Sequence, residues 1–423
     1  MSNTITREYQ YDVVVVGGGT AGVSAAVGAA QAGAKTLLIE RNAYLGGEAT
    51  HSGVGAFCGF YTCGEDPVRV VAGVGDLVLE EMGRLGSTYR EIVSAAGNRN
   101  INFKPEYLKC ALDRLLSRVG VDCLLHALVI DAQVEDGKIQ SVTCADDEGW
   151  FTVKAAVFVD TSGDANLARM AGASTQWGDS QGNVQVGAQP FRLSGVDVTQ
   201  EMTPAAVGRA VAQARQAGIP NLPKEKGFVL KLDDSQIVSV LLPSAEVTGL
   251  SAKALTEMER ETREQALSYA KALKEFMPSM EHSELAVIGP AVGLRETRRL
   301  VGRDIITADD VLNRRKRPDT VARGGWKPEI HKDTNKMGVY LDVPGASYFD
   351  VPLGALRSAD LENLYGAGRM ISTDAVAHAA TRVMGTCFAT GHAAGVAAAC
   401  QAREGSVDVN NIQAELRRQG ALV

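Results

Sequence analysis

The stretch that decides the fold is Tyr11–Glu40, which reads YDVVVVGGGTAGVSAAVGAAQAGAKTLLIE. It opens with the β-branched run Val13–Val16, without polar alternation, which is typical of a parallel strand buried on both faces. The glycines lead into an alanine-rich segment that we expect to be helical to about Ala32, and the apolar run Lys35–Ile39 predicts a second strand. The unit is therefore expected to be strand, turn, helix and strand, as in a doubly wound parallel sheet.

The glycines of this stretch have the spacing G-x-G-x-x-G. In a strand-to-helix turn the first permits the tight bend, the second lets a pyrophosphate approach the backbone, and the third allows the helix to pack closely on the strand. The free N–H groups at the helix N-terminus then face the phosphate charge. A carboxylate at the end of the second strand can accept the ribose hydroxyls. The predicted dinucleotide-binding residues are Gly17, Gly19, Thr20, Ala21, Gly22 and Glu40.

The composition favours a small-molecule partner. The 423 residues carry 43 Lys and Arg against 50 Asp and Glu, and the net charge of -7 argues against a nucleic-acid or anionic-membrane surface. The seven cysteines contain no C-x-x-C pair, so we expect neither a metal centre nor a secreted disulfide framework. The expected location is the reducing cytoplasm.

Two segments bear on membranes. The start of the chain, MSNTITREYQYD, is polar and charged, unlike a signal peptide or an anchor. Residues 383–402 are 20 uncharged positions, long enough for a span, with Gly391 and Gly395 in a G-x-x-x-G pattern. Their side chains are mostly small and would gain little from lipid. We expect a small-residue helix packed inside a soluble protein, and no membrane span.

Changes of pattern along the chain predict two domains in three segments. Residues 1–173 form the first part of a Rossmann-like α/β domain, residues 174–335 an inserted α+β domain, and residues 336–423 the return to the first domain. The dipeptide Asp136-Gly137 predicts a hairpin turn between two alternating strands. Further helices are expected over 66–86, 104–119, 203–217, 251–276 and 383–402, and further strands over 129–134, 138–143, 155–159, 184–193, 227–242 and 361–367.

Further motifs make nearly the whole chain resemble a known family. Glu40 is followed by Arg41 and soon by Leu45-Gly46-Gly47, and the segments Val157–Asp164 and Asn363–Arg369 come later. With the glycine loop, these resemble the flavin segments of FAD-dependent oxidoreductases of the glutathione-reductase type. A closer resemblance is to the succinate dehydrogenase and fumarate reductase flavoproteins, because Arg-Glu-Thr-Arg-Arg at 295–299 follows the inserted domain.

The resemblance implies bound FAD and an inserted substrate domain, and we expect the FAD to be held noncovalently. Arg369 departs from the wider superfamily, which places an acidic residue there to hold the ribityl chain, and Asp374 is the candidate replacement. Arg41 also fits a contact with the 2′-phosphate of NADP or a solvated surface arginine. Gly385 and Thr386 begin the last long helix, whose N–H groups would face the pyrimidine edge of the flavin. The additional FAD contacts implied are Arg41, Gly46, Gly47, Asp160, Gly163, Gly368, Arg369, Arg382, Gly385 and Thr386.

The candidate reacting groups are His378, Arg295 and His51. His378 lies between the C-terminal flavin motif and the last long helix, and is expected either to move a proton or to be a core histidine. Arg295 is expected to hold a substrate carboxylate through two parallel hydrogen bonds, or else to form a structural ion pair. On a helix, Arg295 and Arg299 would share a face. A histidine near His51 is bonded to the flavin in the dehydrogenase relatives, but the spacing differs here, so we expect a polar or structural role.

These features predict hydride transfer between a small polar or anionic organic substrate and FAD. Cys58 and Cys63 have the C-x-x-x-x-C spacing of flavin disulfide reductases, although they come later after Gly47 than in that family, and this alternative stays open. A non-catalytic flavin-binding electron-transfer subunit is the third interpretation. The sequence leaves the electron acceptor and the formation of a homo-oligomer open.

Overall fold

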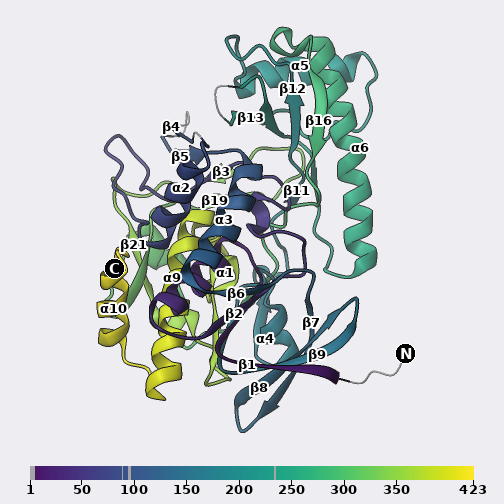
Figure 1. The fold of residues 1–423 in the computed structure, drawn as a ribbon. Coiled ribbons are helices and arrows are strands. Elements are labelled where there is room, and N and C mark those ends of the chain that lie inside the picture. The colour runs from purple at the N-terminus through teal and green to yellow at the C-terminus, as the bar shows by residue number, and fades with distance from the viewer. Residues whose placement is uncertain (1–4, 88, 94–96, 233–234) are drawn as a thin grey trace.

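The structure, a computed structural model, describes residues 5–87, 89–93, 97–232 and 235–423. A seven-stranded sheet lies at its centre, in the order β6-β2-β1-β9-β8-β7, with β22 also paired to β9 (Figure 1). The neighbours β6, β2, β1, β9 and β22 are parallel, and β8 and β7 extend the sheet antiparallel. The strands are β1 Ile5–Val16, β2 Thr36–Ile39, β6 Asp122–Leu124, β7 Leu128–Glu135, β8 Lys138–Asp146, β9 Gly149–Asp160 and β22 Leu364–Gly366.

The central strand β1 is buried on both faces, as its unbroken valine run predicts. Val13 and Val15 pack into one core cluster, whereas Val14 and Val16 pack into the cluster on the opposite face. Helices α1 (Thr20–Gln31), α2, α3, α9 and α10 contribute to the first cluster, and the short α4 to the second. The remaining bounds are α2 Val74–Arg84, α3 Pro105–Val119, α4 Asn166–Met170, α9 Met384–Glu404 and α10 Val409–Arg418. The Rossmann-like α/β fold is therefore confirmed.

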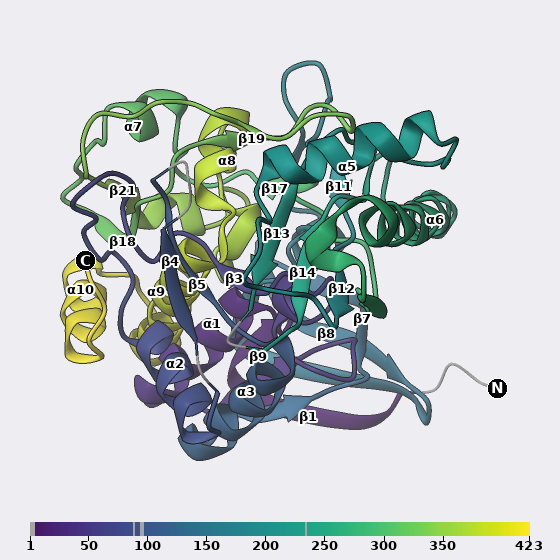
Figure 2. The same ribbon diagram turned by 90° about the horizontal axis from the view of Figure 1, so that it is seen from above.

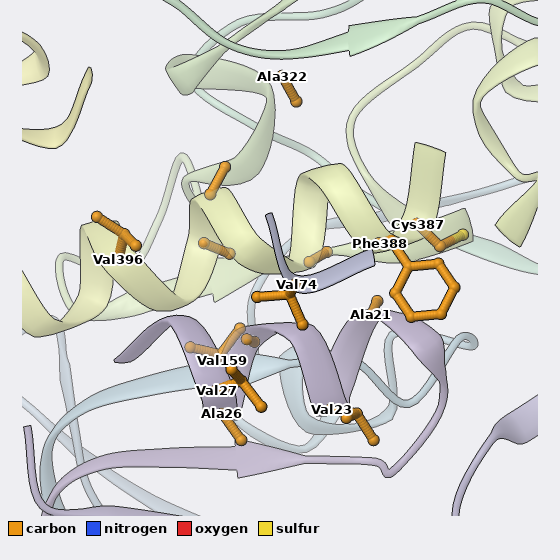
Figure 3. Close-up of a cluster of buried hydrophobic side chains, with 14 of the residues drawn as sticks. Ala21, Val23, Ala26, Val27, Val74, Val159, Ala322, Cys387, Phe388 and Val396 are labelled. Atoms are coloured by element: carbon orange, nitrogen blue, oxygen red, sulfur yellow. The ribbon is translucent and has the colours of Figure 1, made fainter. Parts of the chain in front are cut away.

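Glycines bring helices α1 and α9 into backbone contact. A Cβ added at Gly391 would lie 2.1 Å from the Ala21 carbonyl oxygen, and one at Gly395 would lie 1.9 Å from that of Ala25. No larger residue fits without separating the helices. Figure 3 shows α9 running along α1, with Phe388 beside Ala21. The small-residue helix expected over 383–402 is thus a core helix.

No described helix is by itself long and apolar enough to cross a bilayer. Helix α8 (Ala375–Thr381) and α9 combine the necessary length and apolarity only as a pair, and the pair is bent by 92°.

A second core is built on a four-stranded antiparallel sheet, β13-β14-β12-β16. Helices α5 and α6 pack with it in a separate apolar cluster that spans Phe191 to Met280. Figures 1 and 2 show this teal and green unit at the end of the molecule away from α10. The bounds are β12 Phe191–Ser194, β13 Phe228–Lys231, β14 Val238–Leu241, β16 Glu284–Ile288, α5 Pro204–Gln216 and α6 Ala252–Phe276.

Shorter ladders lie outside these two sheets. The chain rejoins the first core at Ile306, and Val321 and Ala322 pack there as well, ahead of the expected return at 336. The pairs are β3 with β5, β4 with β5, β10 with β17, β11 with β15, β18 with β21 and β19 with β20. Their bounds are β3 Ala56–Phe57, β4 Arg90–Val93, β5 Arg99–Asn102, β10 Thr175–Trp177, β11 Gly187–Ala188, β15 Ser244–Ala245, β17 Arg298–Leu300, β18 Thr320–Gly324, β19 Glu329–Ile330, β20 Val339–Tyr340 and β21 Phe349–Pro352, with the helix α7 at Ala308–Leu312.

Local signals set several element ends. The expected hairpin turn is present, because Asp136 and Gly137 both have positive φ (48° and 71°) between β7 and β8. The helix expected over 66–86 begins only at Val74. Gly73 there has φ +66°, and its N–H donates to the Asp76 carboxylate over 3.1 Å, which caps the helix.

Candidate active site

A first cavity opens at the carboxyl ends of β1, β2 and β9, and we call it the glycine-loop cavity. Such a position is where open α/β sheets bind ligands. Among the residues expected to contact a dinucleotide, those that line it are Gly17, Gly19, Thr20, Ala21, Glu40, Arg41, Gly47, Gly163, Gly368, Arg369 and Arg382, together with His51.

The three glycines of the loop differ in what surrounds them. A Cβ at Gly17, whose φ is +107°, would lie 2.6 Å from the Thr161 carbonyl oxygen, and one at Gly22 would lie 1.8 Å from that of Gly17. These two positions therefore set the turn and the packing of α1. Gly19 is different, since the nearest atom to an added Cβ is 3.8 Å away. Gly19 precedes the N-terminus of α1, which has no side-chain cap. The free space beside Gly19 and the free N–H groups of the helix fit the binding of a phosphate group.

Glu40 closes β2 with its carboxylate turned into the glycine loop. It accepts hydrogen bonds from the Gly18 N–H at 2.6 Å and from the Asn42 N–H at 2.8 Å. Oε1 also accepts from the Asn42 side-chain amide over 2.7 Å, whereas Oε2 keeps a second lone pair that a ribose hydroxyl could use. The neighbouring Arg41 is exposed at the cavity edge, where the surface interpretation and the phosphate contact both remain open.

Arg369 lies between two carboxylates in this cavity. It donates to Glu48 and to Asp164, each over 2.6 Å. Burial lowers the pKa of Arg369, but Asp164 and Glu48 outweigh burial and raise it above the ordinary arginine value. Its Nε is buried and has no hydrogen-bond partner among the described residues. The free space beside Gly19 and the Arg369 Nε–H group without an acceptor both fit a bound dinucleotide.

Five of the expected FAD contacts do not line the cavity, and Gly22, which sets the packing of α1, is one of them. Asp160 is fully buried, and its carboxylate accepts from the Ser162 and Ala168 N–H groups, so it fixes the turn after β9 instead. Gly385 donates its N–H to the Cys58 carbonyl over 2.8 Å, and the buried Thr386 beside it also lies outside. Gly46 supports the loop from behind through its N–H bond to the Gly18 carbonyl. The α9 residues that do reach the cavity are Met384 and Cys387.

The expected substitute for the missing acidic residue, Asp374, is occupied elsewhere. Its two carboxylate oxygens accept from the N–H groups of Ala377 and Ala308. Asp374 therefore caps α8 and does not line the cavity. Asp164, for which the sequence motifs predict no such role, places its carboxylate at the cavity beside Arg369.

A second cavity adjoins the first, and we call it the adjoining cavity. The two share a wall. The shared residues are Glu48, Leu294, Arg369, Arg382 and Met384. Beyond this wall the cavity is lined by apolar side chains, such as Phe228, Leu230 and Trp326, and by a polar cluster. The polar cluster comprises Lys224, Arg295, Glu329, His331 and Tyr340, together with Arg382 of the shared wall.

More basic than acidic side chains line the adjoining cavity. Arg295 donates to the Val186 carbonyl over 2.7 Å and forms no ion pair with any described residue. Burial, followed by the charge of Arg382, lowers the pKa of Arg295 to about 10. Burial, followed by the charge of Arg295, lowers the pKa of Lys224 to about 7. These cations repel one another in a site that water reaches poorly, so an anion bound there would be stabilised.

Glu329 is the carboxylate of this cluster, and a two-strand ladder positions it. Glu329 of β19 pairs with Tyr340 of β20, and the tyrosine hydroxyl donates to its Oε1 over 2.9 Å. His331 Nε2 lies 3.1 Å from the same oxygen, and Arg382 donates to the Glu329 main-chain carbonyl over 3.0 Å. Burial raises the pKa of Glu329, but these neighbours outweigh burial and hold it below its usual range.

The two histidines expected to react lie in different places. His378 is 1% exposed in α8 and lines neither cavity. Burial, then the charges of Arg299 and Arg382, lowers the pKa of His378 well below the usual value. The core interpretation of His378 fits this position, because a neutral buried ring has no access to a substrate. His51 lines the glycine-loop cavity, with Nδ1 3.4 Å from the Tyr44 hydroxyl.

The Arg-Glu-Thr-Arg-Arg segment is extended rather than helical. β17 begins at Arg298 and pairs with β10, where Arg299 lies opposite Gln176. The strand ladder separates the arginines: Arg295 enters the adjoining cavity, whereas Arg299 is 1% exposed and bonds to Glu296 over 2.5 Å. Arg299 and not Arg295 is therefore the arginine that pairs with Glu296.

The cysteine pair does not have the character of a redox centre. Cys58 and Cys63 are both free thiols. Burial raises the pKa of Cys58 to about 12 and also raises that of Cys63, which disfavours the thiolate that disulfide exchange requires. Cys58 lines the adjoining cavity, where it packs with Tyr340.

Several lining residues were not identified from sequence. Lys224, Glu329, His331 and Tyr340 lie in segments without a recognisable motif. The signal available in the sequence was the Glu-x-His triplet at 329–331, with Tyr340 shortly after it. Within the described part of the chain, no group of three or more His, Cys, Asp or Glu side chains could hold a metal ion.

Comparison with known proteins identifies the family. A family model described as FAD dependent oxidoreductase matches residues 12–416. The thiamine thiazole synthase of Aeropyrum pernix is 26% identical over 244 residues, which cover 54% of this chain and 82% of that protein. Digeranylgeranylglycerophospholipid reductase 2 of Methanothermobacter thermautotrophicus is 27% identical over 195 residues, which cover 45% of this chain and 49% of that protein.

A solved structure shows the same fold over most of the chain. The p-nitrophenol 4-monooxygenase of Pseudomonas putida DLL-E4 matches with a TM-score of 0.52 at 11% identity, covering 97% of this chain and 84% of that one. These relatives are a synthase, a reductase and a monooxygenase. The narrower resemblances to glutathione reductase and to succinate dehydrogenase stay predictions.

Proposed function

Because the chain belongs to the FAD-dependent oxidoreductase family, we propose that it moves a hydride between FAD in the glycine-loop cavity and a small anionic organic substrate in the adjoining cavity. The observation that carries the proposal is the position of Arg295. Its guanidinium lines the adjoining cavity without an ion-pair partner among the described residues, and only a shared wall separates that cavity from the first.

The residues of this chain would bind, orient and shield the reactants. Gly19 and the α1 N-terminus would hold the pyrophosphate, Glu40 the ribose, and Arg369 the part of the cofactor near the shared wall. FAD itself accepts or supplies the hydride when bound. Arg295 and Lys224 would hold the substrate anion, and the apolar side chains around them would exclude water and strengthen that attraction.

The two alternatives fit the site less well. A disulfide reductase needs a thiolate, whereas burial keeps Cys58 and Cys63 protonated. A flavin-binding electron-transfer subunit has no need of an anion-selective cavity beside the cofactor. The position of Arg295 also agrees with the resemblance to succinate dehydrogenase and fumarate reductase, whose Arg-Glu-x-Arg-Arg motif it belongs to.

The test is the redox response of the bound flavin. The purified holoprotein is mixed without oxygen with a panel of small carboxylates, and with the matching primary amides as neutral controls. The proposal expects at least one carboxylate to bleach the oxidised flavin or to reoxidise the reduced flavin, and its amide to be inactive. Reaction with amides alone would contradict it.

A further inference from the structure

Two residues of the adjoining cavity are tied to the same point of the backbone. The Arg295 side chain donates to the Val186 carbonyl over 2.7 Å, and the Val186 N–H donates to the His331 carbonyl over 3.0 Å. The positive charge of Arg295 also reaches the His331 ring, because after burial it is the largest cause that lowers the pKa of His331. Both residues line the cavity that adjoins the predicted flavin site.

The hydrogen bonds of His331 decide which ring nitrogen is free. Nε2 lies 3.1 Å from Glu329 Oε1, and a carboxylate at that distance requires Nε2 to carry the proton. Nδ1 then has a lone pair, and it has no hydrogen-bond partner among the described residues. The ring is about nine-tenths buried. An unmet acceptor of this kind in a cavity fits a donor on a ligand.

The surroundings hold this ring in one orientation. The Tyr340 hydroxyl donates to the same Glu329 oxygen over 2.9 Å, which fixes the carboxylate that His331 bonds to. Gly338 lies against the ring face, because a Cβ at that position would be 2.6 Å from the imidazole. Glu329 and Tyr340 are thus positioning residues, in the arrangement that carboxylate–histidine pairs use for proton transfer.

We propose that His331 is a catalytic base that accepts a proton through Nδ1 from a hydroxyl or amino group next to the substrate carboxylate, which makes the substrate a 2-hydroxy or 2-amino acid. The inference rests on the proposed function. In the oxidative direction the substrate C–H bond breaks and its electron pair leaves as hydride to the flavin. The O–H or N–H proton passes to His331, and a C=O or C=N bond forms. The substrate loses two electrons and the flavin gains them.

Charges around the ring couple this base to substrate binding. Burial, then the positive charges of Arg295 and Arg382, lowers the pKa of His331 to about 3, and the opposing charge of Glu329 raises it. Tyr340 is neutral and bonded to Glu329, and Lys224 adds a further positive charge to the same cavity. A substrate carboxylate cancels the arginine charges, so its arrival raises the basicity of His331 at the moment a base is needed.

The first arm of the test uses the wild-type holoenzyme. Three sets of carboxylates are compared for anaerobic flavin reduction: 2-hydroxy acids, 2-amino acids, and saturated acids such as butyrate with neither group. We expect reduction by at least one acid of the first two sets and none by the third. If no carboxylate of any set exchanges electrons with the flavin, the proposed function fails. If only the saturated acids react, the function stands and the inference about His331 is overturned.

The second arm uses His331→Asn, His331→Gln and, as a matched control, the exposed His282→Asn. Both His331 variants should keep FAD and the affinity for butyrate, while flavin reduction slows by roughly 10²–10⁴-fold. The pH dependence of that step should also flatten, which a merely structural role would not produce. Unchanged rates and an unchanged pH profile in either folded variant would overturn the proposal.

A third readout does not depend on turnover. In ¹⁵N-histidine-labelled holoenzyme, the signal missing in His331→Asn identifies this ring among the six histidines. Titration with butyrate should raise the pKa of that ring. A His331 ring whose pKa does not respond to butyrate at saturating concentration would contradict the coupling.

Discussion

Arg369 and Asp164 are 205 residues apart in sequence, and their side chains bond over 2.6 Å at the glycine-loop cavity. Asp164 follows β9 and Arg369 follows β22, two strands that are neighbours in the sheet. Asp164 Oδ1 also accepts from the Thr297 hydroxyl over 2.8 Å, so one carboxylate ties both halves of the first domain to the segment that leaves the inserted one. An acidic side chain thus lies beside Arg369 at this cavity, and it comes from a different strand end.

Removing the charge of Asp164 should destabilise the protein. Asp164→Asn keeps an acceptor oxygen but leaves Arg369 with Glu48 as its remaining carboxylate. A hydrogen bond to a charged group contributes roughly 1.5–3 kcal/mol, and we expect a loss of that size in urea unfolding. The exposed Asp131→Asn is the control. Equal stability of the two variants would mean that the contact with Asp164 is dispensable.

Gly19→Val should abolish FAD binding without preventing folding. The nearest atom to a Cβ at this position is 3.8 Å away and φ is -69°, so an added Cβ meets no clash and the backbone conformation is open to any L-residue. Its methyl groups would instead occupy the space of the pyrophosphate. The purified variant should be colourless, with a far-ultraviolet circular dichroism spectrum like that of wild type.

Gly83→Val is the matched control, because nothing lies within 4 Å of a Cβ there and the residue is in α2. It should purify yellow. Full flavin occupancy in Gly19→Val would show that the cofactor does not use this loop.

The flavin should be bound noncovalently. His51 lines the glycine-loop cavity and is the histidine that the dehydrogenase resemblance suggests for a covalent link. Its spacing from Gly47 differs from that pattern, so acid precipitation should release the yellow colour into the supernatant, and the intact mass should be that of the bare chain. A yellow pellet that turns colourless in His51→Ala would reverse this expectation.

The parts of the fold that local sequence encodes were predictable. The valine run of β1, the glycine loop and the Asp136-Gly137 turn each specify their structure within a few residues, and the structure contains all three. The Arg-Glu-Thr-Arg-Arg segment was harder, because its extended form depends on pairing between β17 and β10, more than 120 residues earlier in the chain. Tertiary pairing overrides local preference in such segments.

The adjoining cavity was not predictable for a related reason. Lys224, Arg295, Glu329 and Arg382 come from four separate segments, and only the folded chain brings their charges together. His378 shows what proximity along the chain leaves open. It lies close in sequence to the last flavin motif, and the packing of α8 buries it in the core, which fits the second of its two predicted roles.

The pH dependence of stability should show the titration of Lys224. The folded protein holds its pKa at about 7, below the ordinary value of 10.5, through burial and then Arg295. Between these two values the unfolded chain binds more protons than the folded one, so the free energy of unfolding should rise with pH, by at most about 1.4 kcal/mol per unit. Below pH 7 both states carry the proton and this contribution is flat.

Lys224→Met should remove that rise, and the exposed Lys253→Met should not. Urea unfolding from pH 6 to 10 measures both variants. The affinity of wild-type holoenzyme for butyrate should fall above pH 7, as Lys224 loses its charge. If the free energy of unfolding depends on pH in the same way in wild type and in Lys224→Met, the predicted titration of Lys224 is excluded.

Arg295→Lys should weaken substrate binding and spare the cofactor. Arginine holds a carboxylate through two parallel hydrogen bonds, and lysine offers a point charge on a flexible chain that cannot copy this geometry. Loss of one charged hydrogen bond costs roughly 1.5–3 kcal/mol, which corresponds to a rise of about 10- to 150-fold in KM for a reacting carboxylate. Flavin content should be unchanged, because Arg295 lines the adjoining cavity and not the glycine-loop cavity.

The same loss should appear in the butyrate affinity measured from the flavin spectrum. The exposed Arg260→Lys on α6 is the control, and it should change neither KM nor the butyrate affinity. Unchanged KM and butyrate affinity in both Arg295→Lys and Arg295→Ala would remove this residue from the substrate site, and loss of flavin would move it to the cofactor site.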